Sequence, residues 1–267
     1  MKKILIPLLL LILIVSVNTI TAQKKSTIKG EEVAYAGADG VVQKGYVAYD
    51  ASLKKERPAI IIIHEWWGSN DYVRMRADML AKLGYIAIAL DMYGDGKQGL
   101  TPPEATALAT PFYKDPQLSK SRIEAAIAKI KTYPETNPGK IAAIGYCFGG
   151  SMVLNAAKMG MDFKGVISFH GGLAGVPAVD GITKAKILVC HGAADKFISP
   201  EELKNFRDNL DAEKVSYSFI TYPDATHAFT NKESTANGIK FSIPVAYNAA
   251  ADKKSWEDMK KFFKTIF

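Results

Sequence analysis

The chain alternates two hydrophobic patterns: continuous β-branched runs and segments whose apolar residues recur at helical spacing. "PAIIIIHEWWG" (58–68) and "YIAIALDMYG" (85–94) are continuous runs, and residues 69–84 between them have helical spacing and end at Gly84. Continuous apolar runs are typical of parallel strands that are buried on both faces. The same alternation predicts strands at 140–146, 165–172, 185–195 and 215–225, and helices at 119–133, from Gly149, at 199–212 and at 252–267.

This order predicts a single α/β domain over residues 24–267, with a doubly wound, mostly parallel sheet and helices on both faces. Ahead of it, residues 31–49 alternate apolar and polar positions around Asp39-Gly40, which predicts a β-hairpin. Residues 94–117 interrupt the regular alternation. Their four prolines predict short helical pieces at most, in an insertion near the functional site.

The N-terminus has the pattern of a cleavable export signal over residues 1–23. Lys2 and Lys3 precede an apolar run from Ile4 to Val17, and a polar, small-residue stretch ends near Ala22. The run is shorter than the ~20 apolar residues that a spanning helix needs. We therefore expect a periplasmic or secreted protein with no stable membrane span after cleavage, and a membrane anchor is the less favoured alternative.

The distribution of charge argues against one class of binding partner. The formal charge of the whole chain is +7, and removing the two signal lysines leaves 7 − 2 = +5 for the mature chain. Its lysines are interspersed with acidic residues, as in "EELKNFRDNLDAEK", whereas nucleic-acid binding requires a clustered basic surface. Nucleic acid is thus not an expected partner, and the oligomeric state cannot be inferred from these features.

Cys147 and Cys190 end the apolar runs "KIAAIGYC" and "KILVC", and the strand predicted at 165–172 lies between them in sequence. If that strand also lies between them in the sheet, the two positions are roughly 9 to 10 Å apart, which exceeds the reach of a disulfide. We therefore expect Cys190 to be a free, buried thiol despite the predicted export.

Candidate chemical groups follow four of the predicted strands, where the functional loops of doubly wound sheets gather. The segments are "HEWWG" (64–68), "GYCFG" (145–149), "HGAAD" (191–195) and "DATHAF" (224–229). Cys147, Asp195 and His227 occur in the order nucleophile, acid, histidine, which is the order of α/β-hydrolases. Cysteine then takes the place of serine.

The stretch from Gly145 to Gly149 fits a sharp turn that exposes a nucleophile at the start of a helix. Glycines at both positions avoid crowding in the turn, and the helix N-terminus favours a thiolate. Cys147 as a packed core thiol is the alternative, but it leaves both glycines and His227 unexplained. His227 would accept the thiol proton and Asp195 would orient its imidazole, although a loop aspartate is often only a turn residue.

An acyl-transfer mechanism also requires two backbone N–H donors for the developing oxyanion. Phe148 supplies one by its position after the nucleophile. The second is expected at Trp66, in the loop after the first continuous strand.

The segments "HEWWGSNDYVRMRADMLAKLGYIAIALDMYG", "GYCFGG", "HGAADKFISP" and "YPDATHAFTN" resemble the dienelactone hydrolase family over nearly the whole mature chain. The resemblance implies that Glu65 contacts the cysteine and helps to deprotonate it. It also implies two arginines that grip a substrate carboxylate. Here those positions fall near Asp95 and Asn231, so we expect neutral substrates, with Lys97 or Lys232 as the possible replacements and Asp95 at the mouth of the site.

The remaining candidates are less specific. His64, His170 and His191 end strands, and we expect them to make supporting hydrogen bonds, because no Cys, His and Asp spacing suits zinc. Trp66, Trp67, Tyr93 and Phe229 are candidates either for the substrate pocket or for packing at its rim.

Together these features predict an ester or lactone hydrolase that uses Cys147 and needs no cofactor or metal. Acyl transfer, thioester cleavage, and a silent binding protein of the same fold are the alternatives.

Overall fold

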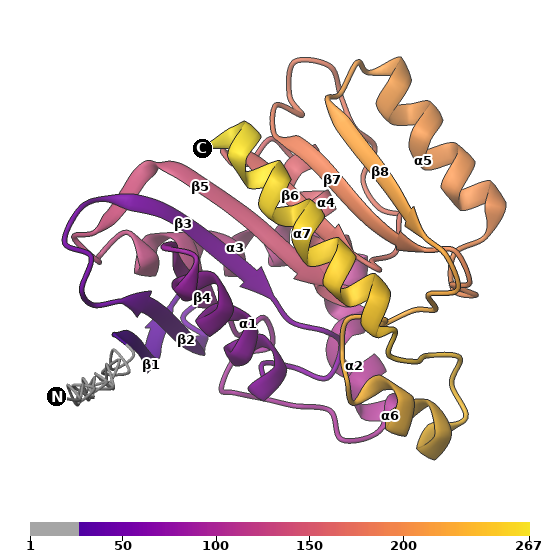
Figure 1. The fold of residues 1–267 in the computed structure, drawn as a ribbon, viewed down its shortest axis with the longest axis horizontal. Helices are drawn as coiled ribbons and strands as arrows, with labels where there is room; N and C mark the ends of the chain where they lie inside the picture. The colour runs from indigo at the N-terminus through magenta and orange to yellow at the C-terminus, as the bar shows by residue number, and fades with distance from the viewer. Residues whose placement is uncertain (1–26) are drawn as a thin grey trace, which may run out of the picture.

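The computed structural model describes residues 27–267, so the predicted signal peptide lies outside the described part. These residues form one eight-stranded sheet with helices on both faces (Figure 1). The strands are β1 (Ile28–Ala36), β2 (Val42–Asp50), β3 (Arg57–Ile63), β4 (Ile86–Ala89), β5 (Thr136–Tyr146), β6 (Gly165–Phe169), β7 (Lys186–Gly192) and β8 (Tyr217–Tyr222). The helices are α1 (Asp71–Lys82), α2 (Pro102–Lys114), α3 (Pro116–Ile130), α4 (Phe148–Lys158), α5 (Pro200–Ala212), α6 (Ser234–Phe241) and α7 (Ala249–Ile266).

The strand order is β1-β2-β4-β3-β5-β6-β7-β8, and the pairs from β4 through β3 to β8 are parallel. The predicted hairpin is confirmed as β1 and β2, which pair antiparallel. β6 lies between β5 and β7, and this separates the strand that leads to Cys147 from the strand that contains Cys190. Both cysteines are free, as predicted, and the Cys190 thiol is fully buried.

Alternate residues of the central strands supply the two apolar layers of the core. On β3, Ile60 and Ile62 belong to the layer shared with α1 and α7, while Ile61 and Ile63 face the layer shared with α2, α3, α4 and α5. All four side chains have no solvent exposure. Burial of both faces explains why the strand reads as an unbroken apolar run in the sequence.

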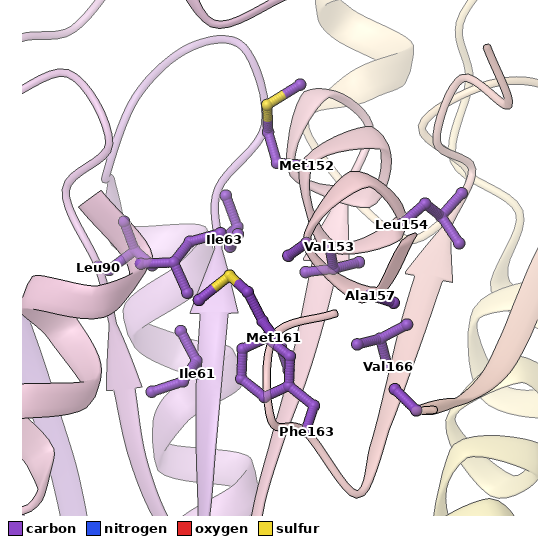
Figure 2. Close-up of a cluster of buried hydrophobic side chains, with 14 of the residues drawn as sticks. Ile61, Ile63, Leu90, Met152, Val153, Leu154, Ala157, Met161, Phe163 and Val166 are labelled. Carbon is purple, nitrogen blue, oxygen red and sulfur yellow. The ribbon is translucent and has the colours of Figure 1, made fainter. Parts of the chain in front are cut away.

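Helix α4 packs its apolar residues directly over the middle of the sheet. Figure 2 shows Val153 and Ala157 of this helix beside Val166 of β6, with Ile61 and Ile63 of β3 in the same cluster. Fully burying each larger side chain stabilises the fold by about 1.5–3 kcal/mol. This packing fixes the N-terminal end of α4, where Cys147 lies.

The segment 94–117 differs from its prediction, because it contains the 13-residue helix α2. Pro102 and Pro103 occupy the first turn, where the missing N–H of proline costs no helical hydrogen bond. Pro111 lies inside the helix and is tolerated there in spite of its missing donor. In Figure 1, α2 lies close to α6 beyond the arrowheads of β3 and β5. The segment therefore does lie at the end of the sheet where the candidate groups gather.

Candidate active site

Cys147 sits on a sharp turn between β5 and α4, with backbone angles φ 52° and ψ −115°. The two flanking glycines are required by close backbone contacts. A Cβ atom on Gly145 would lie 2.0 Å from the carbonyl oxygen of Gly149, and a Cβ on Gly149 would lie 2.3 Å from the carbonyl oxygen of Ile63. A positive φ at a non-glycine residue is strained, and such strain concentrates at functional sites.

The three predicted residues come together at the carboxyl end of the sheet. Nε2 of His227 lies 2.9 Å from Sγ of Cys147, and Nδ1 of His227 lies 2.9 Å from Oδ2 of Asp195. The other carboxylate oxygen of Asp195 accepts a hydrogen bond from the N–H of Phe197. The histidine can therefore exchange a proton with the thiol while the buried carboxylate fixes its orientation.

The surroundings of His227 favour its protonated form. Burial alone would lower the pKa of the imidazole, but the Cys147 sulfur and the Asp195 carboxylate outweigh burial and raise the pKa to about 10. An imidazolium next to a sulfur stabilises a thiolate, which is the nucleophilic form of cysteine.

The two backbone N–H groups expected to bind an oxyanion belong to Phe148 and Trp66. Phe148 is the first residue of α4, where helical geometry leaves the N–H without an intrahelical acceptor. Trp66 follows β3 and lines the same pocket as Cys147. The Tyr93 hydroxyl donates a hydrogen bond to the Trp66 carbonyl oxygen at 2.9 Å, and this bond helps to fix the Trp66 backbone.

Glu65 is buried, lines the same cavity as Cys147 and is held by Asn231. The side-chain amide of Asn231 donates to Oε2 of Glu65 at 2.6 Å, while Oε1 has no hydrogen-bond partner. Burial raises the pKa of Glu65 to about 7, although Asn231 and His227 act in the opposite direction. Asn231, which stands near one of the expected arginine positions, thus binds the glutamate as a neutral donor.

Cys147 and His227 open into a cavity of about 360 Å³. Most of its lining is apolar or uncharged, and its carboxylates are those of Glu65 and Glu202. The other lining residues are Trp66, Trp67, Thr106, Ala109, Thr110, Tyr113, Gly172, Phe197, Ile198, Ala228, Asn231, Ser234, Asn237, Ile243 and Val245.

The aromatic residues proposed from the sequence divide into two groups. Trp66 and Trp67 line the cavity, as does Asn231. Tyr93 and Phe229 are buried and do not line it. Tyr93 packs its ring against Phe112 and Phe148, while Phe229 packs against His170 and Tyr222. These two residues therefore pack against the residues around the site and do not contact a substrate in the cavity.

The charged residues near the expected arginine positions do not reach the cavity. Asp95 pairs with Lys97 at 3.6 Å, and both side chains are more than half exposed. Neither residue lines the cavity, and the exposed Lys232 does not line it either. The expectation that Asp95 lies at the mouth of the site is wrong, because the turn after β4 directs it into solvent.

Two of the three other histidines make the expected supporting hydrogen bonds. His64 donates from Nδ1 to the Glu65 carbonyl and accepts the N–H of Met92 at Nε2. His170 contacts the Cys147 backbone. His191 differs, since it packs against Phe219 and its buried Nδ1 has no partner. Within residues 27–267, no group of three His, Cys, Asp or Glu side chains is placed to hold a metal ion.

Several lining residues escaped the sequence analysis. Tyr113 comes from α2, Ser234 and Asn237 come from α6, and Glu202 comes from the first turn of α5. The Glu202 carboxylate accepts the backbone N–H groups of Leu173 and Ala174. The one signal that could have identified these residues is their position in segments that follow the carboxyl ends of strands.

Comparison with known proteins identifies the family of this chain. A sequence model described as the dienelactone hydrolase family matches residues 44–267. A Synechocystis protein whose name provisionally assigns it as a carboxymethylenebutenolidase is 29% identical over 239 residues, which cover 83% of this chain and 91% of that protein.

Solved structures show the same relationship. A dienelactone hydrolase-like promiscuous phosphotriesterase from metagenomic libraries superposes with a TM-score of 0.83 at 31% identity, over 90% of this chain and 99% of that chain. A thermophilic esterase from the planctomycete Thermogutta terrifontis shares the fold alone, with a TM-score of 0.61 at 19% identity over 89% and 92% of the two chains. The chain therefore belongs to the dienelactone hydrolase family, and it is a hydrolase of the α/β-hydrolase fold that acts on ester bonds.

Proposed function

We propose that this chain is an exported carboxylic-ester hydrolase that acts on small neutral esters or lactones through an acyl-enzyme thioester on Cys147. The proposal rests on one observation: Cys147, His227 and Asp195 form a hydrogen-bonded series at the wall of an apolar cavity. None of its steps calls for a cofactor.

In the first half-reaction, His227 takes the proton of the Cys147 thiol, and the thiolate attacks the ester carbonyl carbon. The resulting oxyanion would be stabilised by the N–H groups of Phe148 and Trp66. Collapse of this intermediate breaks the carbon–oxygen bond to the alcohol, which leaves with the proton from His227. A thioester on Cys147 remains.

In the second half-reaction, His227 removes a proton from water, and the hydroxide attacks the thioester carbonyl. The carbon–sulfur bond then breaks, the carboxylic acid leaves, and the proton returns to sulfur. Asp195 stays ionised throughout and stabilises the imidazolium in both halves.

The charge of the cavity supports a neutral substrate. Of its lining residues within 27–267, none is a lysine or arginine. His227 favours a positive charge but is paired with Cys147 and Asp195, while Glu65 and Glu202 are acidic. A substrate carboxylate would therefore enter without the bidentate partner that arginine provides. The apolar walls instead suit an uncharged acyl or alcohol group.

Two alternatives use the same site. Acyl transfer or thioester cleavage requires the same triad, and only the accepting nucleophile or the leaving group differs. A silent binding protein has no use for a strained cysteine hydrogen-bonded to a histidine, which supports the catalytic interpretation.

A substrate panel tests the proposal. Purified protein is assayed on p-nitrophenyl esters of several chain lengths, on neutral lactones and on an anionic dienelactone, with Cys147→Ala as the control. We expect a higher kcat/KM for the neutral compounds and no turnover by the variant. Full activity of Cys147→Ala would refute the cysteine mechanism, and a clear preference for the anion would refute the substrate assignment.

Export is a separate part of the proposal, and it is supported by the charged, apolar and small-residue order of the N-terminus. Among residues 27–267, no helix combines the length and apolarity needed to cross a membrane. N-terminal sequencing of the mature protein is expected to begin near Gln23. An intact Met1 in the exported fraction would contradict cleavage.

A further inference from the structure

A buried histidine that the proposed mechanism does not use is hydrogen-bonded to the backbone of the nucleophile. His170 follows β6, is 1% exposed and has a positive φ of 42°. The N–H of Cys147 donates to Nδ1 of His170 at 3.1 Å and to the carbonyl oxygen of Phe169 at 3.0 Å. The strained residue after β6 is therefore joined to the strained residue after β5.

The opposite nitrogen of the same ring reaches the loop that carries the proposed base. Because Nδ1 accepts a hydrogen bond from the Cys147 N–H, the neutral ring carries its own proton on Nε2. Nε2 lies 2.7 Å from Oγ1 of Thr230, so it donates to that hydroxyl. Thr230 is 2% exposed and lies three residues after His227. One imidazole thus connects the Cys147 turn to the His227 loop.

Thr230 is itself held from the α1 side. Its hydroxyl lies 2.6 Å from the Tyr72 hydroxyl, and its carbonyl oxygen accepts a 2.7 Å hydrogen bond from Arg76. Arg76 is 3% exposed and paired with Asp252 of α7 at 2.6 Å. The His227 loop is therefore anchored to α1 and, through Arg76, to α7, as well as to His170.

His170 also contacts the proposed base directly. The rings of His170 and His227 pack edge to face with centroids 5.4 Å apart. Burial lowers the pKa of His170 well below its usual value, with the charges of His227 and Arg76 acting in the same direction. A neutral His170 can pack beside an imidazolium without charge repulsion.

We propose that His170 and Thr230 are positioning residues, which fix the Cys147 turn and the His227 loop relative to each other and so maintain the contact between Sγ and Nε2. This role rests on the proposed function, in which Cys147 and His227 are the reacting pair. Neither residue lines the cavity, so their effect is expected on the chemical step rather than on substrate binding.

The test compares Thr230→Val, Thr230→Ser and the matched control Thr136→Val. Thr136 is also a buried threonine, and its hydroxyl donates to the Ile130 carbonyl at 2.8 Å, but it lies at the opposite end of β5 from the site. The readouts are kcat and KM on a neutral ester, and the pH profile of Cys147 alkylation by iodoacetamide, with the modified peptide identified by mass spectrometry.

We expect Thr230→Val to lower kcat by about tenfold, with KM changed less than about twofold. Its alkylation profile should shift to higher pH, because a displaced His227 imidazolium stabilises the Cys147 thiolate less. Thr230→Ser should restore both readouts, and Thr136→Val should resemble the parent protein. Thermal unfolding sets an assay temperature at which every variant is folded.

An unchanged kcat and alkylation profile in folded Thr230→Val would overturn the proposal. Equal losses in Thr136→Val would overturn it as well, since they would show a general effect of losing a buried hydroxyl. If Thr230→Val does not fold, His170→Asn is measured in its place and is expected to give the same kcat and alkylation changes, with parental values overturning the proposal. Failure of the proposed function is distinguishable, because it would appear as full activity in Cys147→Ala.

Discussion

Replacing Glu65 by glutamine should make the protein more stable at neutral pH, because the folded state holds this carboxyl in a site that disfavours its charge. Glu65 is 3% exposed, and burial raises its pKa from 4.5 to about 7. A tenfold change in a proton-binding constant corresponds to about 1.4 kcal/mol. The ionised carboxylate thus costs about 3 kcal/mol of unfolding free energy once the pH is above the folded pKa.

The sign follows from proton binding. Between about pH 4.5 and about pH 7 the folded protein retains a proton on Glu65 that the unfolded chain has released. Stability from this group therefore falls as the pH rises through that window. Glutamine stays neutral at every pH, and its side-chain oxygen can still accept the amide of Asn231.

Urea unfolding of the parent protein and of Glu65→Gln, at intervals from about pH 4.5 to about pH 8, measures this difference. We expect the variant to gain about 3 kcal/mol at the upper end and close to zero at the lower end. Glu56→Gln, on the exposed turn before β3, is the control and should change stability by less than about 0.5 kcal/mol throughout. A difference that does not vary with pH, or a less stable Glu65→Gln at about pH 8, would refute the reasoning.

The remaining predictions concern the triad, the second thiol and the turn. Cys147→Ala and His227→Ala should each lower kcat by roughly 10⁴-fold or more, and Asp195→Asn should lower it somewhat less. The double variant of Cys147 and His227 should lose little more than either single variant, because the residues act as one unit. Ester turnover measures these losses, and additive losses in the double variant would contradict the prediction. Cys190 should react with a thiol reagent only after denaturation, because burial raises the pKa of its thiol to about 12, and titration without reductant should find two thiols. Gly145→Ala should destabilise the fold by about 1–3 kcal/mol or more through its 2.0 Å backbone clash, which urea unfolding measures.

The sheet could be predicted from the sequence because its strands are buried on both faces. The isoleucines of β3 alternate between two apolar layers, so every position must be apolar and the run is unmistakable. The glycine pair around Cys147 was equally informative, since two backbone contacts exclude any side chain there.

The two helices that complete the cavity were harder to predict. The prolines of α2 indicated a broken segment, but two of them lie in the first turn, where proline is favourable. Helix α6 has eight residues, includes Gly238 and buries only Ser234, so it lacks an apolar stripe. Its existence depends on contacts with the rest of the fold rather than on its own pattern.

Interactions between distant residues were the least predictable part of the site. The hydrogen bond between Asn231 and Glu65 joins positions 166 residues apart. The link from His170 to Thr230 spans 60 residues. Nothing in the local sequence of Thr230 distinguishes it from any loop threonine, and only the strand order brings it to the histidine that binds the Cys147 backbone.

The order of the strands also determines when the thiol acquires its base. Cys147 is synthesised 80 residues before His227, and the loop that holds His227 follows β8 at the edge of the sheet. Contacts between such distant positions carry a large loop-closure cost and favour late assembly. A growing or unfolded chain therefore carries an ordinary cysteine, and the reactive pair forms only when the final strand has docked.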